Sequence, residues 1–263
     1  MAIPLTGLCI ADKSGAIQTF DQLGGRGAIS NKALAIPVHL GFPWNSIEFV
    51  VISPATKGEY PSVGEHQQQT DEIYYVLSGE GELITNGTSC IVSAGFLAIA
   101  PKGTRHSIRN LSSQPLTFLV VELQVHSDGP LYQSTSIESL PALLQDTEPD
   151  GFHPARGRLR VASIDLSDFF AAPWGMLSLV EIPPGGCIYE YVEPIHDENL
   201  FVIGGNATIE VAGIRLDSWQ DGLNVLVPKG VPHKIINRSS VDPLTVLCLR
   251  VRPIRNMGGT ICS

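Results

Sequence analysis

Short apolar stretches separated by turn-forming residues recur along the whole chain. Each holds four to eight residues, and Gly, Pro, Asn or Ser residues stand between them. This spacing is typical of an antiparallel sandwich or barrel, in which turns join many short strands. The pattern predicts strands at residues 47–52, 73–77, 96–100, 116–123, 177–182, 200–203, 223–227 and 244–251.

The segment 136–146 departs from this pattern. Its apolar residues recur at helical spacing, and Ser136 is available as an N-cap. The segment lies within a polar stretch over residues 126–160. We therefore expect a short helix within a connection between two domains.

The two halves of the chain repeat one another. A motif of five specified positions occurs twice at an offset of 127 residues, and a shorter motif occurs twice at an offset of 126. One insertion or deletion in an intervening loop accounts for the difference. The longer motif is Gly95-x5-Pro101-x-Gly103-x2-His106-x3-Asn110, repeated as Gly222-x5-Pro228-x-Gly230-x2-His233-x3-Asn237, and the shorter is Asp71-Glu72-x6-Gly79, repeated as Asp197-Glu198-x6-Gly205.

This agreement predicts an internal duplication of one β module. We expect an all-β protein with an N-terminal module over residues 1–125 and a C-terminal module over residues 161–263. A linker with a short helix, over residues 126–160, joins them.

Composition narrows the class of protein. Of the 263 residues, 43% are hydrophobic and 16% are charged, which suits a packed core rather than a disordered chain. The formal net charge of −9 argues against nucleic acid or an anionic membrane as a partner.

The five cysteines are widely spread without a Cys-x2-Cys pair, which favours a reducing compartment. No signal-like N-terminus and no apolar run of about 18 residues is present, so we expect a cytoplasmic protein.

The first copy of the repeat carries side chains that can bind a metal ion. His66 and Gln68 share one face of an extended strand, Glu72 has the same parity, and His106 comes from another strand. Four of the seven histidines of the chain fall in the repeated blocks. Two imidazoles and one carboxylate that leave positions open suit Fe(II), and Mn(II), Ni(II), Co(II) or Zn(II) are alternatives. Tyr74 shares the parity of Glu72 and is either a proton donor or a wall of the pocket.

The second copy departs from this set. At the same spacing before Glu198, the positions of His66 and Gln68 are taken by Val192 and Pro194, which cannot bind a metal. His196, Glu198 and His233 form a candidate second site. The alternative is a degenerate barrel retained for stability and dimerisation.

Both copies resemble a known family. The longer motif is similar to the second conserved motif of the cupin superfamily, and His66-x-Gln68-x3-Glu72-x6-Gly79 resembles the first motif of that family. The resemblance to two-domain cupins (bicupins) implies two tandem jelly-roll barrels, with a metal inside at least one. It places His66, Glu72 and His106 at ligand positions and Gln68 where a second histidine usually stands.

Three kinds of function follow from these observations. The first is a metal-dependent enzyme, a non-haem Fe(II) dioxygenase acting on a small organic substrate, with Gln68, Glu72 and Tyr74 as catalytic candidates. The second uses the same metal without redox chemistry, as an isomerase, dehydratase or lyase, or decarboxylase of a small carboxylic acid. The third is a non-catalytic cupin that binds a small molecule. A homodimer is consistent with all three.

Overall fold

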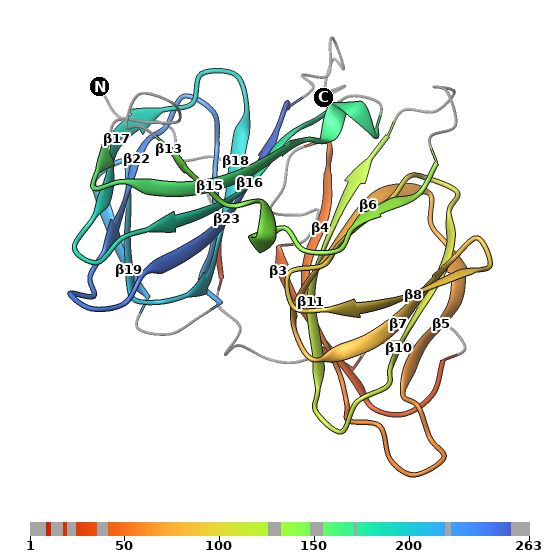
Figure 1. Ribbon diagram of the computed structural model, residues 1–263. Coiled ribbons are helices and arrows are strands. Elements are labelled where there is room, and N and C mark those ends of the chain that lie inside the picture. Colours follow the sequence, from red (N-terminus) through yellow and green to blue (C-terminus); the bar gives the residue numbers. More distant parts are fainter. Residues whose placement is uncertain are drawn as a thin grey trace, which may run out of the picture.

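Strands dominate the computed structural model, which describes residues 9–11, 18–19, 25–35, 42–125, 133–147, 155–170, 173–218 and 222–253. They form two barrels side by side (Figure 1). The first barrel is drawn in orange and yellow and the second in green to blue. The prediction of an all-β fold with two tandem jelly-roll barrels is confirmed.

The first barrel consists of a seven-stranded sheet and a four-stranded sheet that faces it. The larger sheet has the order β12-β9-β6-β11-β4-β3-β2, and the smaller has the order β5-β10-β7-β8. The bounds are β2 Gln18–Thr19, β3 Ile29–Ala35, β4 Trp44–Ile52, β5 Ser62–Gln67, β6 Thr70–Ser78, β7 Glu80–Thr85, β8 Thr88–Ser93, β9 Leu97–Ala100, β10 Arg105–Asn110, β11 Leu116–Gln124 and β12 Thr135–Ile137.

The second barrel repeats this plan with a seven-stranded and a five-stranded sheet. The orders are β1-β21-β18-β23-β16-β15-β13 and β14-β17-β22-β19-β20. The bounds are β1 Cys9–Ala11, β13 Gln145–Thr147, β14 Ala155–Arg156, β15 Leu159–Asp165, β16 Trp174–Ile182, β17 Cys187–Val192, β18 Asp197–Gly204, β19 Ala207–Val211, β20 Ile214–Ser218, β21 Asn224–Val227, β22 Pro232–Asn237 and β23 Leu244–Val251.

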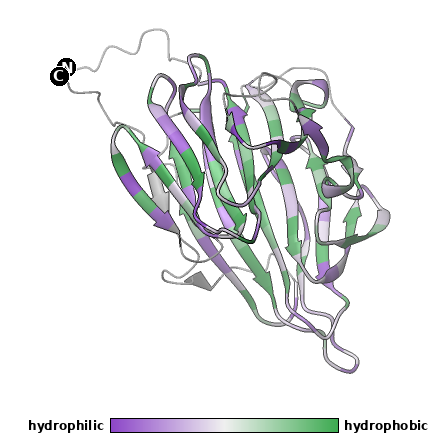
Figure 2. Ribbon diagram, turned by 60° about the vertical axis from the view of Figure 1, so that its left-hand side comes forward, coloured by the Kyte–Doolittle hydropathy of each residue, from purple (hydrophilic) through white to green (hydrophobic). Residues whose placement is uncertain are grey.

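The large sheets of the two barrels pack against each other and bury both of their faces. In β6, Tyr74 and Val76 belong to the core inside the first barrel, whereas Ile73 and Tyr75 belong to a core shared with the second barrel. This explains why such strands appear in the sequence as continuous apolar runs rather than alternating ones. Figure 2 shows that most apolar stretches, in green, lie on the strands.

The helix predicted over residues 136–146 is instead a single 3-10 turn. The turn, η1, spans Pro141–Leu143 and lies between β12 and β13. Proline has no amide hydrogen to donate and disfavours helical continuation, which limits the turn to the residues that follow it. The helical spacing instead reflects packing, because Leu140 is fully buried in the core shared by the barrels. A second 3-10 turn, η2, spans Leu166–Asp168.

Segments outside the two repeats complete both large sheets. The N-terminal strand β1 pairs with β21 of the second barrel. Within the predicted linker, β12 pairs with β9 of the first barrel and β13 with β15 of the second. The division of the chain at residues 125 and 160 remains a prediction. In the structure β1 belongs to the sheet of the second barrel, and the linker contributes β12 to the first barrel and β13 to the second.

The repeated asparagines of the longer motif have a structural role. The Asn110 side-chain amide donates to the carbonyl oxygens of Ile52, Ser53 and Gln114, at 2.7 to 3.2 Å. Asn237 repeats this arrangement in the second barrel, with three acceptors at 2.9 to 3.0 Å. Each amide ties two strand ends together.

Candidate metal centre

The candidate metal ligands of the first copy meet between the two sheets of its barrel. His66 on β5 and His106 on β10 stand opposite each other on neighbouring strands, with ring centroids 4.3 Å apart. Glu72 and Tyr74 reach the same place from β6 in the larger sheet. Gln68, just after β5, lines the same cavity as His66.

Both histidines of this site are held by backbone carbonyls. The Nδ1 atom of His66 lies 2.8 Å from the oxygen of Gly64, and that of His106 lies 3.1 Å from the oxygen of Thr104. Because a carbonyl only accepts, Nδ1 carries the hydrogen and Nε2 keeps its lone pair in the neutral ring. Burial also lowers the pKa of His66, and the nearby His106 lowers it further. This is the tautomer in which histidine binds metals through Nε2.

Tyr74, Glu72 and His106 form a closely spaced triangle. The hydroxyl of Tyr74 lies 2.7 Å from both Glu72 Oε2 and His106 Nε2, and these two atoms are 3.2 Å apart. The hydroxyl has one hydrogen to donate, whereas both neighbours are acceptors in the neutral tautomer. Glu72 is 1% exposed, and its Oε1 has no hydrogen-bond partner. With both histidine rings neutral, no positive charge balances the carboxylate of Glu72.

A cavity of about 30 Å3 opens beside these residues. This volume exceeds what one water molecule requires. Among the described side chains around the cavity there is no lysine or arginine. Its lining consists of His66, Gln68, Tyr74, His106, Glu48, Glu122, Val50, Val63, Ile108, Phe118 and Val120.

Two of the lining carboxylates were not predicted from the sequence. Glu48 lies on β4, and Glu122 lies on β11 directly opposite Glu72 of β6. Burial, together with the charges of Glu72 and Glu48, raises the pKa of Glu122 to about 7. Burial raises the pKa of Glu48 as well. The available signal was that each of these glutamates is the single charged residue of its strand.

The residues of the first barrel fit a divalent cation. Across the described residues, no three or more His, Cys, Asp or Glu side chains converge as a preformed metal cluster. In the first barrel the Tyr74 hydroxyl contacts both Glu72 and His106. However, a cation would accept the lone pairs of the two Nε2 atoms and would give the unpartnered oxygen of Glu72 a partner. It would also reduce the mutual repulsion of the three carboxylates. Nitrogen and oxygen donors of this kind suit first-row divalent metals.

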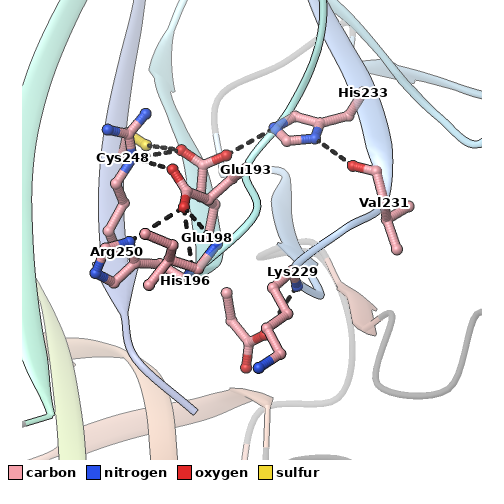
Figure 3. A network of polar contacts seen from close by, with 10 residues as sticks. Glu193, His196, Glu198, Lys229, Val231, His233, Cys248 and Arg250 are labelled. Carbon is pink, nitrogen blue, oxygen red and sulfur yellow. Dashed lines mark hydrogen bonds and ion pairs between the residues drawn. The ribbon is translucent and has the colours of Figure 1, made fainter.

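In the second barrel an arginine supplies the positive charge. Arg250 on β23 stands opposite Glu198, the position that Glu122 takes opposite Glu72. Its Nε lies 2.8 Å from Glu198 Oε1, while His233 Nε2 lies 2.9 Å from the other oxygen of Glu198 (Figure 3). Burial acts to raise the pKa of Glu198, but the hydrogen bond with His233 and the charges of His233 and Arg250 lower it to about 2.

The structure brings together only two of the three candidate ligands in this barrel. Glu198 and His233 are in contact, whereas Nδ1 of His196 lies 3.2 Å from Glu193. In Figure 3 His233 approaches Glu198 and His196 approaches Glu193, from different sides.

Strand pairing also corrects the equivalence drawn from sequence spacing. The residue opposite His233 is Tyr191, not Val192. The ring centroids of Tyr191 and His233 are 4.2 Å apart, close to the 4.3 Å between those of His66 and His106. Tyr191 thus takes the position of His66. Sequence counting missed it because seven positions separate Tyr191 from Glu198, one more than the six that separate His66 from Glu72.

The fold and the buried histidine and carboxylate site define a two-barrel jelly-roll protein. The profile of the cupin domain family matches residues 50–122, which include every candidate ligand of the first barrel. This match places the first barrel in the cupin family, and the second barrel repeats its fold, so the chain has the architecture of a bicupin.

Known proteins similar to this chain include one characterised relative. The oxalate-binding protein of Thermotoga maritima is 41% identical over 61 residues, which are 23% of this chain and 50% of that protein. The matched segment therefore spans only half the length of that relative.

Solved structures resemble the whole chain. The putative glyoxylate-induced protein of Pseudomonas aeruginosa has a TM-score of 0.72 at 18% identity, covering 97% of this chain and 92% of that one. Ylba from E. coli has a TM-score of 0.70 at 11% identity, with coverages of 96% and 94%. Oxalate decarboxylase from Bacillus subtilis has a TM-score of 0.62 at 18% identity, with coverages of 93% and 76%.

Within the described residues no helix is long and apolar enough to cross a membrane.

Proposed function

We propose that this bicupin is a metal-dependent enzyme whose single metal centre lies in the first barrel. The observation that carries the proposal is the pair of Nε2 atoms of His66 and His106, each oriented by a backbone carbonyl. They share a buried site with the unpartnered carboxylate oxygen of Glu72. His66, Glu72 and His106 hold the ion, and Gln68 supplies a weaker amide donor or orients the substrate. Fe(II) is the favoured metal, with Mn(II), Ni(II), Co(II) and Zn(II) as alternatives.

The second barrel holds no metal in this proposal. Its motif glutamate, Glu198, already has the guanidinium of Arg250 on one oxygen and His233 on the other. A cation added there would meet the fixed charge of Arg250, and this repulsion disfavours binding.

Metal analysis of the purified protein tests the proposal. We expect about one equivalent per chain, lost in His106→Ala and kept in the matched variant His233→Ala. Retention in His106→Ala with loss in His233→Ala would place the metal in the second barrel. No binding by the unsubstituted protein, even after anaerobic reconstitution with Fe(II), would contradict the proposal and favour a non-catalytic binding protein.

Non-oxidative proton transfer is the chemistry that the cavity supports best. The hydroxyl of Tyr74 and the carboxyl of Glu122 line it and can give or accept protons. When bound, the metal acts as a Lewis acid that polarises a substrate oxygen. Isomerisation, dehydration and decarboxylation all fit this arrangement.

Dioxygenation is the second candidate. The observation in its favour is the set of two histidines and one carboxylate, which leaves coordination positions for oxygen and substrate. Turnover of a substrate panel under air and under argon separates the two classes. Product formation that continues under argon supports proton transfer, and its loss under argon supports dioxygenation.

The cavity charges favour a substrate that donates hydrogen bonds. Once Glu122 is ionised, Glu48, Glu72 and Glu122 carry one negative charge more than a divalent cation neutralises, and none of the described lining residues is a lysine or arginine. We therefore propose a small neutral or cationic molecule with hydroxyl, amide or amine groups, rather than a dianion. Oxalate, which gives two of the similar proteins their names, is not proposed as a substrate of this chain.

Lactate and lactamide, which have nearly the same shape, test this preference. We expect Glu122→Gln in the metal-loaded protein to strengthen lactate binding by about tenfold, because it removes a like charge, and to weaken lactamide binding. The exposed substitution Glu80→Gln serves as the control. Equal responses to lactate and lactamide in Glu122→Gln would contradict the assignment.

A further inference from the structure

Two reciprocal hydrogen bonds cross the interface between the barrels. Trp174, the first residue of β16 in the second barrel, donates its indole hydrogen to Asp71 Oδ2 of the first barrel, at 3.2 Å. Trp44, the first residue of β4 in the first barrel, donates in the same way to Asp197 Oδ2 of the second, also at 3.2 Å. Each barrel therefore holds one aspartate of the other.

Each of these aspartates directly precedes the glutamate of the shorter repeated motif. Asp71 is followed by Glu72, and Asp197 by Glu198. A tryptophan from the other barrel therefore fixes the strand one residue before the glutamate. In the first barrel, that glutamate is the carboxylate ligand of the proposed centre.

Asp71 also fixes the turn that precedes His106. Its Oδ1 accepts the backbone amide hydrogen of Lys102 at 2.7 Å. In the same turn, Thr104 donates its amide hydrogen to the oxygen of Pro101, and its own oxygen holds Nδ1 of His106. Asp71 is thus hydrogen-bonded to the turn that orients His106, and it directly precedes Glu72 in the chain.

We propose that Trp174 is a positioning residue for the metal centre of the first barrel, acting through Asp71 on Glu72 and His106. The inference rests on the proposed function, because it assumes a metal at these ligands. It gives the second barrel a role in the chemistry of the first. Without the indole donor, Asp71 Oδ2 loses a hydrogen bond in a site where Asp71 is 4% exposed. A buried carboxylate without that donor shifts to find another partner.

The chain provides a matched control for this test. Trp44 makes the same bond across the same interface, and both tryptophans are nearly fully buried in the shared core. Asp197 likewise accepts the amide hydrogen of Lys229, at 2.9 Å. The glutamate next to it, Glu198, is bound by Arg250 rather than by the proposed metal.

Trp174→Phe and Trp44→Phe are compared in the full-length protein. The measurements are the metal dissociation constant, by competition with a chelator using Mn(II) and anaerobic Fe(II), and the Tm of the metal-free protein. We expect similar falls in Tm for the two variants. We expect metal affinity to fall about tenfold in Trp174→Phe, as when a partner of a metal ligand is removed, and to change less than about twofold in Trp44→Phe.

Equal changes in metal affinity for the two variants would overturn the inference while leaving the proposed function intact. Absence of metal binding by the unsubstituted protein would overturn both. If either tryptophan variant fails to fold, Asp71→Asn and Asp197→Asn form a second matched pair of nearly unchanged volume. The same asymmetry in metal affinity is expected of them, and equal effects would again overturn the inference.

Discussion

A single position opposite the motif glutamate gives the two barrels different chemistry. Glu122 faces Glu72 in the first barrel, and Arg250 faces Glu198 in the second. The first arrangement accumulates negative charge and favours a cation. The second supplies its own cation, so its carboxylate is neutralised within the chain.

Replacing Arg250 by Gln leaves Glu198 buried without its guanidinium partner. We expect a loss of about 3–5 kcal/mol in the free energy of unfolding, because removing one member of a buried ion pair leaves an uncompensated charge. Arg160→Gln is the control, since the side chains of the Arg160–Glu181 pair are 49% and 24% exposed, and this substitution should cost less than about 1 kcal/mol. Urea unfolding at pH 7 measures both. Similar losses for the two variants would contradict this account of the second barrel.

The pH dependence of stability follows from the same pair. The pKa of Glu198 in the folded protein is about 2, below the value of about 4.3 for an unfolded chain. Glu198 therefore contributes stability above about pH 4.3, and this contribution is lost as the pH falls toward 2. In Arg250→Gln, the free energy of unfolding should fall less steeply as the pH is lowered from about 4.3 toward 2.

At the scale of the element, the turn between β6 and β7 depends on a glycine. Gly79 has a φ of +87°, and a Cβ there would lie 2.4 Å from the oxygen of Pro115. Gly87 has a φ of +81° but no atom within 4 Å of such a Cβ. We expect Gly79→Ala to cost more than about 3 kcal/mol and Gly87→Ala about 1 kcal/mol, because only the first adds a backbone clash to the strain of positive φ. Equal losses in urea unfolding would show that the clash is relieved without cost.

The sequence predicts the strands well because their signal is local. The runs at 73–77 and 116–123 become the centres of β6 and β11, where burial on both faces demands continuous apolar residues. The segment 136–146 misleads because its apolar spacing serves the shared core and two sheet edges. Strand pairing over long distances decided its conformation, and no local pattern records that pairing.

The candidate site is predictable only in part for the same reason. Motif spacing brings out His66, Glu72 and His106, which the structure places together. Glu122 joins them only through the register of β11 with β6. Tyr191 takes the position of His66 because the segment before Glu198 is one residue longer than the segment before Glu72, and only strand pairing locates that extra residue.

At the scale of the whole molecule, the shared core makes the barrels dependent on each other. Trp44, Ile47 and Leu119 of the first barrel pack in one buried cluster with Leu177 and Leu249 of the second. Separating the barrels would expose this apolar surface to water, which is unfavourable.

We therefore expect the metal-free protein to unfold in a single calorimetric transition rather than two. Equality of the calorimetric and van't Hoff enthalpies is the check. Two resolved transitions would show that the barrels unfold separately despite their common core.

The pairing of β1 with β21 also has a consequence for how the chain is made. Residues 9–11 are synthesised before their partners at 224–226, with more than 200 residues between them. At about 5–20 residues per second, the early strand waits roughly 10–40 s for its partner. During that interval the strands of the first barrel, β2 to β12, are synthesised, while β1, an edge strand of the second barrel, stays unpaired. Completion of the second barrel is thus timed by the arrival of the C-terminal third of the chain, and a slow step in translation there would prolong the exposure of that edge strand.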